Sequence, residues 1–297
     1  MSVHALTERA MVMNLSISRW QGQRLDREAS QRVTEQAGAN SDAARVNKHL
    51  VPKEALAPVQ TAANTVRDHF LTNTLPWRDN GDRLMTRQLY TRFIETHERL
   101  ASEFNVAVDK FLSTDYPEAK AQAEFRMGSL FNPDDYPSVA ELRHRFRITL
   151  DFEPLTTSND FRVQIDQQHV DKVKSAMEEA ALRRVQAAQA DVWKRLLERV
   201  GRYHERLAST NDDGKPAVFR DTLVENLEEL VEMIPGLNIL DDPNIEQIRQ
   251  DILAKLSGHT AQDIRKDAEL REDLAGEAKE IVDKMQGFMK AFGGGFE

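Results

Sequence analysis

The feature that most constrains the fold is an unbroken helical pattern over residues 168–208, which contain no proline and a single glycine, Gly201. A straight helix of this length extends about 60 Å, which is too long for one compact core to cover. Apolar residues recur every three or four positions along one face, with charged residues between them. They are Val170, Val173, Met177, Ala181, Val185, Ala188, Val192, Leu196, Val200, Tyr203 and Leu207. We therefore expect a long helix whose apolar seam packs against another helix.

A second long seam lies in residues 83–112. Its apolar stripe consists of Leu89, Phe93, His97, Leu100, Phe104, Val108 and Phe111. We predict that the two helices pair as an antiparallel, coiled-coil-like hairpin, because each seam needs a partner. Val192, Leu196 and Val200 are separated by two successive steps of four, where a heptad would alternate, so we expect the supercoil to unwind locally there.

Three short segments show the alternation of polar and apolar residues that is typical of strands: residues 12–19, 145–152 and 161–166. The last two are separated by residues 154–159, which predict a hairpin. Two isolated strands are marginally stable in water, so we expect the first segment to join them. The sequence thus predicts a small antiparallel three-stranded sheet at the base of the helical hairpin.

The predicted fold class is mainly α, divided by a turn that follows residue 208. Residues 1–10 are expected to be a flexible N-terminus, residues 11–208 an α+β domain with the long helical arm, and residues 215–287 a C-terminal helical region. Residues 288–297 are expected to be a flexible tail. Its apolar side chains, which we expect to contact a partner or a second copy, are Phe288, Met289, Phe292 and Phe296.

Composition excludes several classes of protein. The chain of 297 residues has no cysteine, so disulfides, thiolate metal sites and cysteine nucleophiles are excluded. Its net charge of −9 argues against a generally basic, nucleic-acid-coating surface, although a local basic patch is compatible with it. We find neither an apolar run long enough to span a bilayer nor the layout of a signal peptide, and therefore expect a soluble cytoplasmic protein.

No catalytic signature stands out. The chain contains no Walker P-loop, no Gly-x-Gly-x-x-Gly and no Gly-x-Ser-x-Gly motif, so neither nucleotide hydrolysis nor serine-hydrolase chemistry is indicated. The hexapeptide His-Glu-Arg-Leu-Ala-Ser occurs at residues 97–102 and again at residues 204–209. Because the flanking residues do not match at a sustained period, we favour coincidence among helix-forming residues over a duplication.

Metal binding is also poorly supported by the spacing of possible ligands. His97 and Glu98, like His204 and Glu205, are adjacent on a helix, point about 100° apart and cannot easily share one ion. Four carboxylates around the predicted hairpin are possible magnesium ligands: Asp151, Glu153, Asp160 and Asp166. They alternate with the apolar face, so we interpret them as solvated outward residues. We predict no catalytic residue, cofactor or metal site, and expect that the protein is not an enzyme.

Two groups of arginines are candidates for contact with nucleic acid. The first is Arg143, Arg145 and Arg147, the densest basic cluster in the chain. The second is on the long helix: Arg183, Arg184, Arg195 and Arg199. Basic residues on such a helix usually form a solvated face balanced by nearby glutamates, so this interpretation remains open beside DNA binding.

The order of these features resembles a protein family of phages and integrative elements. The resemblance rests on Met13-Asn14-Leu15-Ser16-Ile17, a long helix, the segment Arg145-Phe146-Arg147-Ile148-Thr149-Leu150 and the very long charged helix, and it covers roughly residues 11–290. Such proteins are often encoded beside a MoxR-type AAA+ ATPase and a von Willebrand A domain protein. The resemblance implies a mobile-element origin in a bacterial host and a partnership with that ATPase. It supplies no catalytic residues.

Three functions follow as hypotheses. The leading one is a non-enzymatic, self-assembling scaffold or interaction protein, because much helix surface is left after the core is formed. The first alternative is a nucleic-acid-binding or DNA-protecting protein that uses the arginine clusters. The second is an adaptor of a MoxR-type AAA+ ATPase, which only the resemblance implies.

Overall fold

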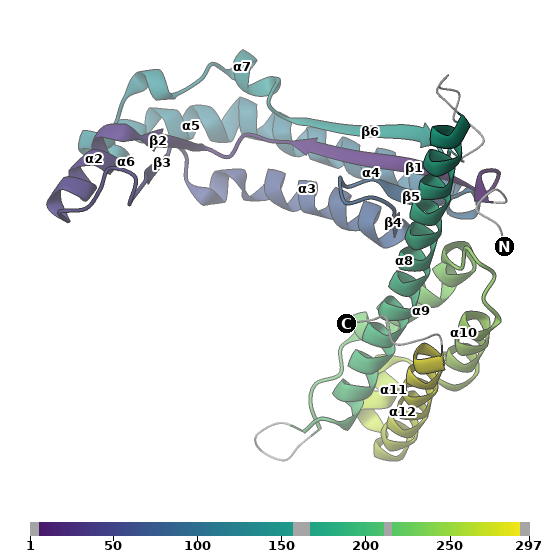
Figure 1. Ribbon diagram of the computed structural model, residues 1–297. Coiled ribbons are helices and arrows are strands. Elements are labelled where there is room, and N and C mark those ends of the chain that lie inside the picture. The colour runs from purple at the N-terminus through teal and green to yellow at the C-terminus, as the bar shows by residue number, and fades with distance from the viewer. Residues whose placement is uncertain (1–5, 157–166, 211–215, 292–297) are drawn as a thin grey trace. The chain divides into compact units, whose positions relative to one another are not determined.

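The computed structural model describes residues 6–156, 167–210 and 216–291, and it is mainly helical with a small antiparallel sheet (Figure 1). The chain divides into two compact units. Unit 1 comprises Met1–Met13, Asn73–Thr91 and Phe152–Glu297, and unit 2 comprises Asn14–Thr72 and Arg92–Asp151. Neither unit is a continuous segment of the chain, because the chain passes from one unit to the other and back.

The strands are β1 (Ala10–Ser18), β2 (Gln23–Asp26), β3 (Val46–His49), β4 (Leu75–Pro76), β5 (Arg83–Thr86) and β6 (Arg147–Pro154). They form one sheet in the order β4-β5-β1-β6 and a separate antiparallel pair, β2-β3. The register of β1 with β5 places Ala10 opposite Thr86 and Met13 opposite Arg83. In unit 1, Val12 and Met13 of β1 are both buried, as are Leu84 and Met85 of β5. Because successive side chains of a strand point to opposite faces, both faces of the sheet are covered here, and the prediction of a single buried face in residues 12–19 is wrong for this part of β1.

The helices of the first half are α2 (Arg27–Gln36), α3 (Lys53–Asn73), α4 (Arg87–Lys110), α5 (Tyr116–Ala121), α6 (Ala123–Met127) and α7 (Val139–Arg143). A π-helical turn, Phe111–Asp115, joins α4 to α5. Pro117 has no amide hydrogen to continue the regular ladder, which accounts for an irregular turn just before it. Short 3₁₀ turns at Gly128–Leu130 and Pro133–Asp135 complete this part of the chain.

An aromatic cluster forms the core of unit 2. Trp20 contacts the ring of Tyr116 edge-on, with 5.6 Å between centroids, and the ring of Phe111 at 6.1 Å. Val59 of α3 and Phe104 of α4 belong to the same buried cluster. Such aromatic pairs add about 0.5–1.5 kcal/mol each beyond the burial of apolar area. The stripe predicted for residues 83–112 is thus buried within unit 2 over much of its length.

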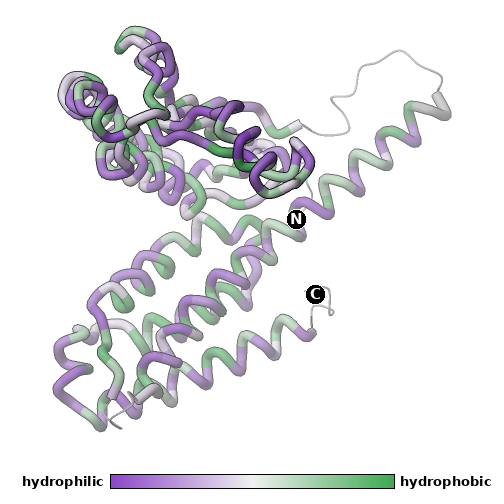
Figure 2. The backbone as a smooth tube through the Cα atoms, turned by 90° about the vertical axis from the view of Figure 1, so that its left-hand side faces the viewer, coloured by the Kyte–Doolittle hydropathy of each residue, from purple (hydrophilic) through white to green (hydrophobic). Residues whose placement is uncertain are grey.

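The long helix α8 (Gln167–Ala208) packs along α12 (Ala268–Ala291) and also contacts α9 (Asp221–Leu237). Its seam is buried from Val185 to Leu207, facing residues such as Ala278 and Ile281 of α12. The remaining helices are α10 (Pro243–Lys255) and α11 (Ala261–Lys266). Figure 2 shows hydrophobic positions recurring along the helices of unit 1, as the period of 3.6 residues requires.

The structure departs from the sequence expectations at several points. The pairing of residues 83–112 with residues 168–208 is not confirmed, because α8 packs on α12 within unit 1 while most of α4 lies in unit 2. Residues 83–86 form β5 and not the first turn of the helix, since they pair with β1. The expected boundary after residue 208 falls inside unit 1. The third expected strand, residues 161–166, lies outside the described residues.

Candidate anion-binding groove

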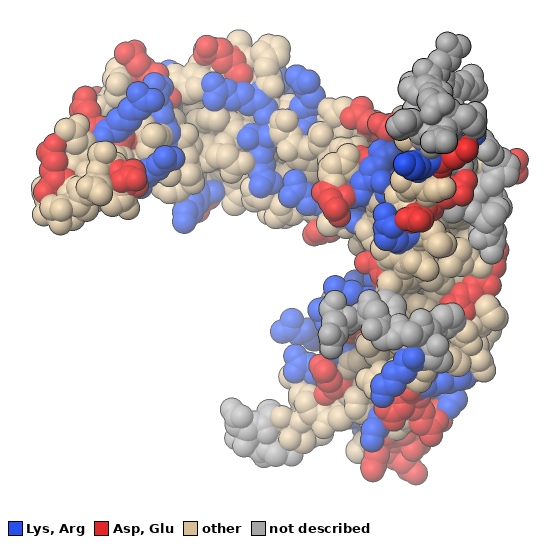
Figure 3. Space-filling view, viewed as in Figure 1, with Lys and Arg blue, Asp and Glu red and all other residues tan. Residues whose placement is uncertain are grey.

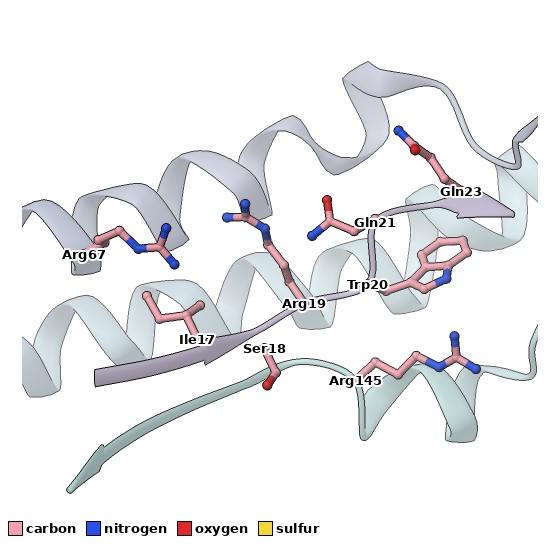
Figure 4. A pocket seen from close by; sticks show the side chains of 8 residues that line it. All are labelled: Ile17, Ser18, Arg19, Trp20, Gln21, Gln23, Arg67 and Arg145. Atoms are coloured by element: carbon pink, nitrogen blue, oxygen red, sulfur yellow. The ribbon is translucent and has the colours of Figure 1, made fainter. Parts of the chain in front are cut away.

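An open groove of about 550 Å³ lies on unit 2, where the chain leaves β1. It is lined by Ile17, Ser18, Arg19, Trp20, Gln21, Gln23, Arg67 and Arg145, and we call it the arginine groove (Figure 4). Three segments that are far apart in the sequence supply these residues: the end of β1 with the residues that follow it, the middle of α3, and the link between α7 and β6. Its lining contains three guanidinium groups and no carboxylate.

Trp20 and Gly22 fix the backbone of the segment between β1 and β2. Trp20 is only 7% exposed and is held by the aromatic core. Gly22 has a φ of +65°, a conformation that other residues rarely adopt. A Cβ atom at Gly22 would lie 2.7 Å from Cδ1 of Leu56 and 3.0 Å from Cγ2 of Val51. Packing at Trp20 and at Gly22 therefore holds the backbone in place on both sides of Gln21.

Arg19 and Arg67 project on the same side of the segment, and the amide of Gln21 lies beside Arg19 (Figure 4). Nη1 of Arg19 is buried and has no hydrogen-bond partner in the described part of the chain. Arg67 is exposed on α3, and the positions three and four residues away on that helix are Ala63, Asn64, Phe70 and Leu71, with no carboxylate. An unsatisfied buried donor costs about 1–3 kcal/mol, and an external acceptor could reach it only if the Arg19 side chain moved.

Arg145 borders the groove on the other side of the β1 segment, in the direction of Trp20 (Figure 4). It follows α7, whose first turn is closed by a capping box between Ser138 and Glu141. Two hydrogen bonds from Ser138 lower the pKa of Glu141, and the positive charge of Arg145 lowers it further. Arg145 is therefore partly balanced by a carboxylate.

The distribution of charge over the chain favours unit 2 as the site for an anion. Unit 2 carries 16 Lys and Arg against 17 Asp and Glu, a net charge of −1, although the whole chain carries −9. Figure 3 shows Lys and Arg side chains gathered over the middle of α3 and the end of β1. Guanidinium groups bind phosphate and carboxylate through two parallel hydrogen bonds, so the groove can hold such an anion and would repel a metal cation.

Only one of the arginines proposed from the sequence, Arg145, lines the groove. Arg143 forms an ion pair with Asp109, and Arg147 is exposed on β6 outside the groove lining. The predicted cluster at residues 143–147 is therefore divided, because neighbours along the chain point in different directions. Arg19 and Arg67 were missed because they are distant in sequence from that cluster and from each other. The available signal was Arg19-Trp20-Gln21-Gly22, an arginine directly before an aromatic residue and a glycine turn.

The arginines proposed on α8 belong to unit 1 and have other roles. Arg183 lies 3.7 Å from a carboxylate oxygen of Glu179, and Arg184 stacks over the ring of Trp77 at 5.9 Å. Arg195 lies 2.7 Å from Asp191 and also donates to the carbonyl of Thr74 at 2.7 Å. Arg199 is partly exposed. The pair of Arg183 with Glu179 is of the kind expected for a solvated face balanced by glutamates, and contact of these arginines with nucleic acid stays a prediction.

The proposed contact residues at the C-terminus fall into two groups. Phe288 and Met289 belong to α12, and the ring of Phe288 lies 6.1 Å from that of Trp193 on α8. Both positions are helical and partly buried, so they are not part of the expected flexible tail. Phe292 and Phe296 lie outside the described residues.

The two copies of the repeated hexapeptide have different surroundings. His97 is 5% exposed and stacks on Phe93 with 5.5 Å between ring centroids. His204 is partly exposed, and its Nδ1 lies 3.0 Å from the carbonyl oxygen of Ala275. Nothing common to the two settings indicates a shared function, which agrees with the interpretation of the repeat as coincidence.

Within the described ranges, no three His, Asp or Glu side chains come together as metal ligands would. Of the four carboxylates weighed as magnesium ligands, Asp151 and Glu153 are exposed, and Glu153 lies 3.6 Å from Arg78. Asp160 and Asp166 lie outside the described residues. The pKa of His97 is lowered by burial and by the neighbouring His69, which favours a neutral core histidine.

None of the helices in the described residues has the length and apolar character needed to cross a membrane. Comparisons with models of protein families, with curated proteins and with solved structures gave no match to this chain. The resemblance to a family of phages and integrative elements, and the ATPase partnership that it implies, therefore stay predictions.

Proposed function

We propose that this protein binds the phosphate backbone of nucleic acid through the arginine groove of unit 2. The observation that supports the proposal most directly is the pair Arg19 and Arg67, two guanidinium groups on one side of a groove without a carboxylate in its lining. Arg19 is partly exposed at the groove, whereas its Nη1 is buried without a hydrogen-bond partner among the described residues. Most of the acidic surplus of the chain belongs to the residues of unit 1.

Phosphate binding by a few arginines has a measurable signature. Each neutralised phosphate releases condensed counterions, so the logarithm of the association constant falls with the logarithm of salt concentration. For single strands the slope is about −0.7 for each phosphate contact. Loss of three arginine contacts should therefore reduce the slope by about 2.

The experiment is a titration of fluorescein-labelled DNA, single-stranded and duplex, followed by anisotropy between about 50 and 300 mM KCl. The variant Arg19→Gln/Arg67→Gln/Arg145→Gln is expected to bind at least tenfold more weakly at 100 mM salt and to have a flatter salt dependence. Circular dichroism and urea unfolding establish that the variant is folded.

The matched control removes three arginines from elsewhere, Arg143→Gln/Arg183→Gln/Arg184→Gln, so that net charge changes equally. It is expected to bind nearly as well as the wild type. Equal losses in the two triple variants would show that only overall charge matters, and the groove would not be the site. The absence of binding at 50 mM salt would contradict nucleic-acid binding altogether.

Self-association through the first half of α8 is a second candidate, and it continues the scaffold hypothesis. Val170, Val173 and Met177 of the seam are only partly buried, whereas the same seam is buried from Val185 onward, and Leu182, which follows the seam residue Ala181, is 53% exposed. An amphipathic face of this kind is able to pack against the same face of a second copy.

Light scattering over a concentration series tests this candidate. Leu182→Glu is expected to lower the apparent mass at high concentration, because it places a charge beside the partly exposed part of the seam. Leu253→Glu, at a position on α10 that is 41% exposed, is the matched control and should leave the mass unchanged. A strict monomer at every concentration would contradict self-association.

A further inference from the structure

A second cavity adjoins the arginine groove. It has a volume of about 260 Å³ and lies between residues 19–23 and the first turns of α3. We call it the α3 cleft. Four residues, Arg19, Trp20, Gln21 and Gln23, line both the cleft and the arginine groove. The two cavities therefore border the same short segment.

The chemistry of the α3 cleft differs from that of the groove. Its apolar lining includes Val51, Pro52 and Leu56 together with Trp20, which also lines the groove, and its polar lining includes His49, Lys53 and Gln60. Pockets for whole drug-sized ligands measure about 300–1,000 Å³, so a cavity of about 260 Å³ suits a single ring-sized group. The cleft thus offers a flat, apolar group a place beside an anion site.

Polar side chains stand at the boundary between the two cavities. Gln21 and Gln23 project on the α3 side of the segment (Figure 4), and both line the cleft and the groove. A glutamine amide both donates and accepts hydrogen bonds, as the edge of a nucleobase does. The combination of guanidinium groups, amides and apolar walls corresponds to the three parts of a nucleotide: its phosphate, the edge of its base and the face of its base.

We propose that the ligand unit is an unpaired nucleotide of a nucleic-acid single strand, with its phosphate at Arg19 and Arg67 and its base in the α3 cleft. This inference rests on the proposed function and narrows it. A base in a duplex is stacked and paired on both sides, so only a single strand can insert one without opening the helix. Stacking of one base on a protein surface changes affinity roughly tenfold or more.

The test compares three fluorescein-labelled ligands of equal length on the full chain: oligothymidylate, an abasic strand with the same phosphates, and a duplex. The wild type is expected to bind oligothymidylate about tenfold more tightly than the abasic strand or the duplex. Ala57 is exposed on α3 and lines the cleft, so Ala57→Phe fills the cleft without removing a core side chain. It should reduce the affinity for oligothymidylate to that for the abasic strand.

Two controls separate the outcomes. Thr65→Phe places the same ring on an exposed part of α3 that lines neither cavity, and it should leave the preference for bases intact. Arg19→Gln/Arg67→Gln should weaken all three ligands together. If the wild type bound the abasic strand and oligothymidylate equally, the inference of a base site would be wrong, but the proposed binding of the phosphate backbone would not be contradicted. No binding of any ligand would overturn both.

A last arm distinguishes a strand from a free nucleotide. Thymidine monophosphate is expected to displace the labelled strand only at much higher concentration than unlabelled oligothymidylate, because a strand contributes several phosphates. Displacement at equal concentrations of nucleotide and strand would overturn the assignment to a strand.

Discussion

Lys48 is a buried cation that joins two acidic side chains within unit 2. It is 8% exposed, its Nζ lies 3.3 Å from Asp26, and it forms a close ion pair with Asp135, which is 5% exposed. Burial opposes the charge, but hydrogen bonds to Asp135 and Asp26 outweigh it and raise the pKa of Lys48. Removing one member of such a group leaves a buried charge without its partner, which typically costs about 3–5 kcal/mol.

We therefore expect Lys48→Met to lower the free energy of unfolding by about 3 kcal/mol. This value is at the low end of the range because Arg24, which lies 3.1 Å from Asp135, still pairs with that carboxylate when Lys48 is removed. Urea unfolding followed by circular dichroism gives this value. Arg99→Gln, which removes an exposed pair with Glu103, is the control and should change the value by less than about 0.5 kcal/mol. Equal stability of Lys48→Met and the wild type would mean that the buried pair contributes nothing.

His97 makes the stability of unit 2 sensitive to mild acid. Phe93 stacks on His97 and, at 4.8 Å and nearly parallel, on His69. Burial and the proximity of His69 lower the pKa of His97 below about 6.5, its value in an unfolded chain. As pH falls below that value, the unfolded state binds a proton at His97 more readily than the folded state does. The contribution of neutral His97 to the free energy of unfolding is therefore complete above about pH 6.5 and is lost as pH falls toward the pKa of His97 in the folded protein.

The wild type should therefore lose more stability between about pH 7 and pH 5.5 than His97→Phe, which cannot titrate. Urea midpoints measured at both pH values check this. His144→Gln, at an exposed histidine, is expected to behave as the wild type does. An identical loss in His97→Phe would assign the acid sensitivity to other groups.

At the scale of elements, Gly22 lies in the segment that connects β1 to β2, and its neighbours Gln21 and Gln23 line both cavities. Gly22→Ala should destabilise the protein by more than the cost of about 1–2 kcal/mol for a positive φ, because the new methyl group must displace Leu56. Gly38→Ala is a matched control, since Gly38 also has a positive φ but a Cβ there meets nothing within 4 Å. Unfolding and strand binding should both show the difference. Equal costs in the two variants would mean that the close approach to Leu56 is easily relaxed.

Periodicity predicted the elements better than their partners. The pattern from Val170 to Leu207 correctly indicated α8, and the alternation around Met13 correctly indicated β1, because each pattern reports which side of an element is apolar. Neither pattern carries information about which other element covers that side, so α12 was missed as the partner of α8. Residues 83–86 fit a helical stripe as well as a strand, and only pairing with β1 decides between them. The arginine groove could not be predicted from the sequence for the same reason, since residues from three segments far apart in the chain line it.

At the scale of the whole molecule, all four boundaries between the units fall inside regular elements. The chain changes unit within β1, at the end of α3, early in α4 and within β6. Two domains joined by a linker would instead be separated at exposed loops. Unfolding of unit 2 must therefore disrupt helices and strands that also supply residues to unit 1, including the part of β1 that pairs with β5.

We accordingly expect the two units to unfold in one cooperative transition. The tryptophans provide separate probes, because Trp20 lies in unit 2 whereas Trp77 and Trp193 lie in unit 1. Two backgrounds, one retaining only Trp20 and one retaining only Trp193, are each unfolded in urea with and without Lys48→Met. Although Lys48 is in unit 2, the substitution should lower the midpoint reported by Trp193 as much as that reported by Trp20. A shift confined to Trp20 would show instead that the units unfold independently, as separate foldons.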